Sequence, residues 1–310
     1  MDVNGEPKGY IKNEGDSKMS YYINGPDVDS NIVELWSSKR LPFEPKGWLH
    51  DMRSSLIEAI SQLEIGDDAF LRATYHSEVL ELCDLENILL SNVGTGKFKK
   101  LCQQGFLLER SFQSGPYPPD GFKNKLHYQR YEITSQQQRP VYWDTEKVLA
   151  SWENISLVKL TSDTKPHEYW KAMKENDVTI LTNEAYGGYF GIDVQLTIPE
   201  RKGFNLAAVV KTMLDGIIAA FHVHRGDQTE LISERLARIL SAETHSVAKL
   251  LLDGSCAVLG DRDLLYPFQN NVQWNPADDK CVAIKITCQK DTEKALPTIS
   301  GFLYAAAERR

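Results

Sequence analysis

Cysteine is scarce in this chain of 310 residues, which contains five, and no two of them form a Cys-x-x-Cys pair. An odd number without that spacing argues against a disulfide framework and against a structural zinc site. We therefore expect reduced thiols, most of them small core residues, in a cytoplasmic protein.

The sequence also lacks a long apolar run. The longest apolar stretch, residues 204–221, is interrupted by Lys211 and Asp215, and it is too polar to cross a bilayer. The first twenty residues are polar and carry both signs of charge, so they lack the apolar core of a signal peptide. We expect no membrane segment.

An excess of basic residues is absent as well. Lysine and arginine number 35 against 43 acidic residues, and the formal net charge is -8. Proteins that hold DNA mainly by neutralising its phosphates usually present a basic face. This balance lowers the expectation of unaided nucleic-acid binding, although a local basic patch remains compatible with it.

The apolar pattern predicts an α/β (α+β) fold of two related mixed-sheet halves with helices packed on the sheets. Residues 48–63 repeat apolar positions at helical spacing, whereas residues 189–198 alternate as a half-buried strand does. We expect a flexible N-terminal arm at 1–40, a first half at 41–145, and a second half at 146–310 with a helical insertion at 228–252.

Both halves show a strand, then a helix start that contains an asparagine. The segments Asn87-Ile88-Leu89 and Asn205-Leu206-Ala207 occupy these places. This repetition indicates an ancient duplication. Chance similarity is the alternative, because a strand followed by a helix is common in α/β proteins.

The segment 201–216, RKGFNLAAVVKTMLDG, resembles the central motif of RusA-type Holliday junction resolvases. In that family an Asp-Leu-Asp-Asn run opens a helix, and a lysine and a Leu-Asp-Gly or Leu-Asp-Ala follow. The residues that match are Asn205, Lys211, Leu214, Asp215 and Gly216. The resemblance implies a magnesium-dependent DNA enzyme, with Lys211 and Asp215 as catalytic candidates. It also implies a later acidic pair, for which Asp261 and Asp263 are candidate metal ligands.

The same segment departs from the family where the two aspartates would stand, because Lys202 and Phe204 occupy those positions. Magnesium prefers carboxylate oxygens, and two-metal phosphodiester cleavage needs several of them to converge. At 3.6 residues per turn, Phe204 falls on the same helical face as Lys211 and Asp215. Taken alone, the second half resembles a nuclease module that has lost its metal ligands.

The first half keeps two acids in the run Asp84-Leu85-Glu86-Asn87, but a lysine one turn later is missing. RusA enzymes are homodimers with paired sites. A fused tandem of one acidic half and one lysine-bearing half would resemble such a dimer, with Asp84 and Glu86 as metal ligands. The alternative is that Asp84 caps a helix and Glu86 complements its dipole. Lys211 and Asp215 could likewise be a solvent-facing i,i+4 pair.

Two other groups of residues invite a metal interpretation that we consider less favoured. Asp278 and Asp279 follow Asn275-Pro276, a context typical of a turn, so we expect turn chemistry there. His222 and His224 could ligate a metal, but a satisfied or an exposed histidine is the usual case.

Three functions remain open from the sequence. The first is a metal-dependent endonuclease on branched or structured DNA. The second is a catalytically inactive scaffold or binding subunit on the same fold, acting through a protein partner or as a homodimer. The third is a small-molecule enzyme of another family, because a fold does not fix a function.

Overall fold

The computed structural model describes residues 10–14, 18–27, 30–66, 70–77, 83–118, 127–134, 139–199 and 204–309. The first half of the chain consists of strands and short helices in the following order. They are β1 (Tyr10–Glu14), β2 (Lys18–Asn24), β3 (Ile32–Ser37), α1 (Trp48–Ser61), β4 (Phe70–Ser77), the π-helical turn η1 (Asn87–Ser91), the 3-10 turn η2 (Thr95–Phe98), β5 (Gly105–Ser111) and β6 (His127–Thr134).

The second half repeats this alternation and contains an insertion. Its main elements are β7 (Trp143–Ser156), α2 (Pro166–Lys174), β8 (Val178–Ile180), β9 (Phe190–Ile198), α3 (Leu206–Ala220), β14 (Cys281–Lys290) and β15 (Thr298–Glu308). Between α3 and β14 lie β10 (Val223–His224), α4 (Thr229–Leu240), α5 (Thr244–Leu252), β11 (Asp261–Arg262), β12 (Leu265–Phe268), β13 (Asn271–Trp274) and the 3-10 turn η3 (Asp278–Lys280).

The two halves share one strand arrangement within an eleven-stranded sheet of order β1-β2-β3-β6-β4-β5-β14-β9-β15-β7-β8. In the first half β4 is parallel to β5 and antiparallel to β6, which is antiparallel to β3. In the second half β9 is parallel to β14 and antiparallel to β15, which is antiparallel to β7. The halves meet where β5 pairs antiparallel with β14. The predicted α+β fold of two related mixed-sheet halves is confirmed.

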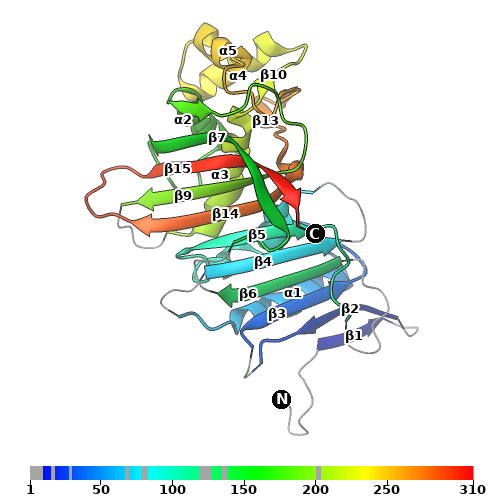
Figure 1. The fold of residues 1–310 in the computed structure, drawn as a ribbon. Helices are drawn as coiled ribbons and strands as arrows, with labels where there is room; N and C mark the ends of the chain where they lie inside the picture. Colours follow the sequence, from blue (N-terminus) through cyan, green and yellow to red (C-terminus); the bar gives the residue numbers. More distant parts are fainter. Residues whose placement is uncertain are drawn as a thin grey trace.

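The main helices of both halves lie on one face of this sheet, the face away from the viewer in Figure 1. The alternation along β9 explains why α3 packs there. Ile192, Val194 and Leu196 are fully buried, and they belong to the same core as Val210 and Ile217 of α3. Helices α4 and α5 stand at the end of the molecule farthest from the N-terminal strands (Figure 1).

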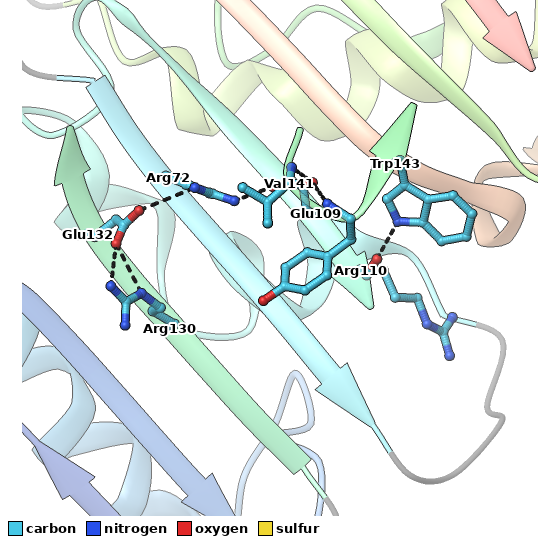
Figure 2. Close-up of polar contacts among 8 residues, drawn as sticks. Arg72, Glu109, Arg110, Arg130, Glu132, Val141 and Trp143 are labelled. Atoms are coloured by element: carbon cyan, nitrogen blue, oxygen red, sulfur yellow. Dashed lines mark hydrogen bonds and ion pairs between the residues drawn. The ribbon is translucent and has the colours of Figure 1, made fainter. Parts of the chain in front are cut away.

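Glu109 of β5 binds the segment that connects the two halves, around residues 141–142, as Figure 2 shows. Its fully buried carboxylate accepts hydrogen bonds from the backbone N–H groups of Val141, at 2.6 Å, and Tyr142, at 3.1 Å. The guanidinium of Arg72 on β4 lies 2.8 Å from the same carboxylate. The indole N–H of Trp143 donates to the backbone carbonyl of Arg110 at 2.5 Å. The second half therefore starts in a fixed position beside β5.

Two predicted domain boundaries need correction. The segment 1–40 is not a free arm throughout, because β2 and β3 are strands of the main sheet and Val33 and Leu35 are fully buried. Residues 1–9 of that segment lie outside the described residues. The predicted division at 145 falls inside β7, so the second half begins before Trp143.

The helices predicted within 228–252 are present as α4 and α5, and the segment between α3 and β14 also contains the elements from β10 to η3. The sequence reading missed α2 and β15. None of the described helices is long and apolar enough to span a membrane.

Replacing Glu109 by alanine should destabilise the fold strongly. The change leaves two part-buried N–H groups without their acceptor and removes a partner of the largely buried Arg72. Breaking a buried pair costs about 3–5 kcal/mol. Urea unfolding of the purified variant measures the loss. Asp144→Ala is the control, because Asp144 pairs with Arg309 at the surface and should change the midpoint little. Equal midpoints for the two variants would contradict this role of Glu109.

Candidate functional site

The ammonium group of Lys211 on α3 is surrounded by four carboxylates. Its Nζ atom lies 3.0 Å from Asp84, 3.0 Å from Glu86, 2.9 Å from Asp215 and 2.9 Å from Asp278. Asp84 and Glu86 come from the first half, and the other three residues come from the second. The five residues are called the Lys211 cluster below, and neither half contains all of them.

A distorted helical turn presents the two acids of the first half. The backbone N–H of Ile88 donates to the carbonyl of Asp84, and the helix then widens, with Asn92 N–H donating to the Asn87 carbonyl at 2.8 Å. Such π-helical turns are frequent at functional sites. The Asn87 amide also donates to the Asp84 carboxylate at 2.5 Å. The carboxylate of Asp84 thus contacts side chains, and the helix-capping alternative does not account for its position.

Helix α3 presents the lysine and the third acid. It begins after Asn205, and the i,i+4 spacing places Lys211 and Asp215 on the same side of the helix. Their side chains are 31% and 14% exposed, so the alternative of a solvent-facing pair is wrong. The turn η1 contacts α3, and this contact brings Asp84 and Glu86 beside Lys211.

Asp278 is the cluster residue that the sequence analysis placed elsewhere. It does lie in a turn, the 3-10 segment η3 that leads into β14, as expected after Asn275-Pro276. Its side chain is nevertheless only 12% exposed and points at Lys211. The available signal was that Asp278 stands shortly before β14, the strand that joins the two halves. The pairing of β14 with β5 connects residues far apart in the chain, so neighbouring residues do not reveal it.

Burial dominates the electrostatics of the cluster. Loss of hydration raises the pKa of Glu86 to about 8, and Lys211 only partly offsets that effect. Burial likewise raises the pKa of Asp215 to about 7 and raises that of Asp278. Burial by itself would lower the pKa of Lys211, but the carboxylates, Glu86 first, raise it above its ordinary value. Lys211 is therefore charged at neutral pH, while burial favours the protonated forms of Glu86, Asp215 and Asp278.

Part of this cluster fits a divalent cation. Oxygens of Asp84, Glu86 and Asp278 all lie within 4.8 Å of one another, and carboxylate oxygens are the ligands that magnesium prefers. Oε1 of Glu86 and Oδ1 of Asp215 are buried and accept no hydrogen bond, although both lie within 3.0 Å of Nζ of Lys211. Buried oxygens that face a cationic ammonium can also face a metal cation, so these residues fit a divalent ion.

Two predicted metal ligands lie apart from the cluster. Asp261 is exposed on β11, where it pairs with Arg225 at 2.5 Å. Asp263 follows it and is exposed. Within the described ranges, the one group of side chains able to hold a metal ion includes neither residue. The insertion carries both of them to the β10–β11 pair, away from Lys211.

The remaining sequence candidates do not join the cluster. Lys202 lies outside the described residues, and Phe204 packs against the main core. His222 contacts the Gly260 carbonyl through Nδ1 at 3.2 Å, and His224 is fully buried with neither ring nitrogen hydrogen-bonded. The expectation of a satisfied or exposed histidine is therefore wrong for His224.

Two surface cavities meet at Asp84, one on each side of the cluster. A cavity of about 440 Å³ lies on the first half, and Arg40, Phe43 and Asn87 contribute to its lining. A cavity of about 610 Å³ lies on the second half. Its lining includes Lys211, Asp215, Tyr266, Phe268, Trp274 and Asp278. The cluster thus borders both cavities, and Asp84 lines each of them.

Comparisons with known proteins found no match among protein-family models, curated proteins or solved structures.

Glu86→Gln should change how stability depends on pH. Between about 4.5, the ordinary pKa, and about 8, the folded chain keeps a proton on Glu86 that the unfolded chain releases. Folding is then favoured at low pH, and the wild type should lose up to about 1.4 kcal/mol per pH unit as pH rises through this window. The variant lacks this titration, so it should gain stability relative to the wild type with rising pH.

Urea unfolding at a series of pH values measures that difference, and Asp261→Asn serves as the control because Asp261 is exposed and outside the cluster. A constant difference between wild type and Glu86→Gln across the window would contradict a raised pKa of Glu86.

Proposed function

We propose that the chain is a RusA-like, magnesium-dependent endonuclease that acts on branched or structured DNA. The observation that carries the proposal is the Lys211 cluster, in which acids of one half meet the lysine and acids of the other. The resemblance predicted this composite from separate motifs in the two halves. The matching order of strands in the two halves supports a fused tandem that resembles a dimer.

In this proposal Asp84, Glu86 and Asp278 would hold a magnesium ion. The ion would supply Lewis-acid polarisation of the phosphate and would activate water. Lys211 carries three donors on a flexible stem, so it can hold a phosphate oxygen once the carboxylates bind the metal. Asp215, with a pKa near 7, suits the acceptance of a proton from attacking water and also positions Lys211.

The acidic balance of the chain is compatible with this chemistry. Four carboxylates beside one lysine repel a phosphate, and a bound divalent ion would offset most of that negative charge. DNA binding near the cluster is then expected to depend on the metal. The five cysteines are all free, which supports a cytoplasmic location.

Calorimetric titration with magnesium and with manganese should show binding by the wild type and its loss in an Asp84→Ala, Glu86→Ala double variant. The reason is that the double change removes two of the three carboxylates able to share an ion. The matched control is an Asp261→Ala, Asp263→Ala double variant, which also removes two acids but leaves the cluster intact. Equal affinities for all three proteins would show that the ion binds elsewhere.

Cleavage of a four-way DNA junction should require magnesium and fall at least about a hundredfold in Lys211→Met and in Asp84→Asn, since metal and cation each contribute several kcal/mol to such transition states. Gel electrophoresis of end-labelled junctions measures the rate, with Asp261→Asn as the active control. A folded wild type that binds magnesium and leaves junctions uncut would contradict the nuclease proposal. It would favour the alternative of an inactive scaffold that works through a protein partner.

A further inference from the structure

The hairpin formed by β12 and β13 faces the Lys211 cluster across the larger cavity. Tyr266 and Phe268 of this hairpin are 38% and 51% exposed. Both rings line the same cavity as Lys211 and Asp215. The lining of the cavity therefore combines aromatic rings with charged groups.

The strand geometry places both rings on one face. Side chains alternate along a strand, and Leu265 is fully buried while Tyr266 and Phe268 are exposed. Residues two apart on a strand are separated by about 7 Å. Stacked bases repeat at about 3.4 Å along a nucleic-acid strand. The spacing of Tyr266 and Phe268 along the strand is thus about twice the base repeat. This separation leaves room for one base between the two rings.

The hairpin is held in place at its tip. The turn, in which Gln269 has a positive φ of 50°, is fixed by Arg235 of α4. The guanidinium of Arg235 donates to the carbonyl of Gln269 at 2.8 Å and to that of Asn271 at 3.0 Å.

The end of the hairpin opposite its turn is fixed as well. The ring of Trp274 packs against Trp170 of α2 at 5.7 Å between centroids. Asn275 donates to the carbonyl of Asp263 at 3.0 Å. A pre-positioned hairpin loses little entropy when a ligand binds to its rings.

We propose that the β12–β13 hairpin stacks an unpaired base of the DNA whose phosphodiester lies at the Lys211 cluster, an inference that rests on the proposed nuclease function. A nucleotide combines a flat π-face with a charged phosphate. The cavity lining offers aromatic rings to the base and charged groups to the phosphate. A base inside a duplex is already stacked on both sides, so the hairpin selects unpaired nucleotides. On the other side of Asp84, Phe43 is 69% exposed in the smaller cavity and offers a further ring to the same strand.

The test is binding of a short, fluorescein-labelled oligodeoxyadenylate, alone or annealed to its complement, followed by fluorescence anisotropy with calcium in place of magnesium. The wild type should bind the single strand more tightly than the duplex. Phe268→Ala and Tyr266→Ala should each weaken single-strand binding about tenfold, within the range that stacking of one base contributes. Phe268→Tyr keeps a ring and should restore the affinity. Tyr117→Ala is the matched control, because Tyr117 is 85% exposed and lines neither cavity.

A second arm replaces single bases of the oligonucleotide by abasic sites, one position at a time. At one position the loss of the base should make wild type and Phe268→Ala equal in affinity, as expected for two partners of one contact. Equal binding of single strand and duplex, or equal affinities of wild type and Phe268→Ala for every oligonucleotide, would overturn the hairpin proposal.

These outcomes are separable from those of the nuclease proposal. If junctions are cleaved but Phe268→Ala binds single strands as the wild type does, the hairpin proposal fails while the nuclease proposal stands. If junctions remain uncut but Phe268→Ala loses the single-strand preference, the nuclease proposal fails while the base-stacking hairpin is supported.

Discussion

The antiparallel pairing of β5 with β14 is the constraint on which the rest of the structure depends. It joins two sheets of the same arrangement into one, in the register that sets Leu108 opposite Ile284. The neighbour of β5 is β4, which leads into η1, and the neighbour of β14 is β9, which leads into α3. The pairing of β5 with β14 therefore brings η1 and α3 together on one face. The composite cluster is a consequence of this geometry, since η1 carries two acids and α3 carries the lysine. Glu109 adds a second fastening by fixing the link between the halves to β5.

The cluster is a costly arrangement that the fold tolerates because Lys211 is present. Four carboxylates at 2.9–3.0 Å from one ammonium leave an excess of negative charge in a partly buried place. Burial first, and the neighbouring acids after it, raise the pKa values of Glu86 and Asp215, which favours the protonated form of each. Packed structures retain such strain mainly at functional sites. One acid is enough to pair with a lysine, and Asp84, Glu86 and Asp278 together could also hold a metal ion.

Motif reasoning from the sequence predicted four members of the cluster, because Asp84, Glu86, Lys211 and Asp215 stand in two short runs whose spacing is visible. It could not place Asp278, whose position depends on a strand pairing between residues far apart. It misplaced Asp261 and Asp263 because the family order was extended across an insertion that redirects the chain into β10 and β11. The N-terminal strands were missed for a similar reason. They lie in a segment rich in polar residues, and Val33 and Leu35 are buried in the same core as Met52 and Leu56 of α1, which the local sequence does not show.

The insertion explains how an acidic chain could hold nucleic acid under the proposed function. Phosphate neutralisation needs a basic face, which a net charge of -8 does not favour. Stacking on Tyr266 and Phe268 draws on the π-faces of bases and needs no positive charge. The insertion places those rings beside the cluster, where bound metal would supply the missing cation. Affinity would then come from stacking at the hairpin and from the metal at the cluster. Two such contacts separated by one cavity select a strand whose base is unpaired and whose backbone is accessible, as in a single-stranded segment of branched DNA.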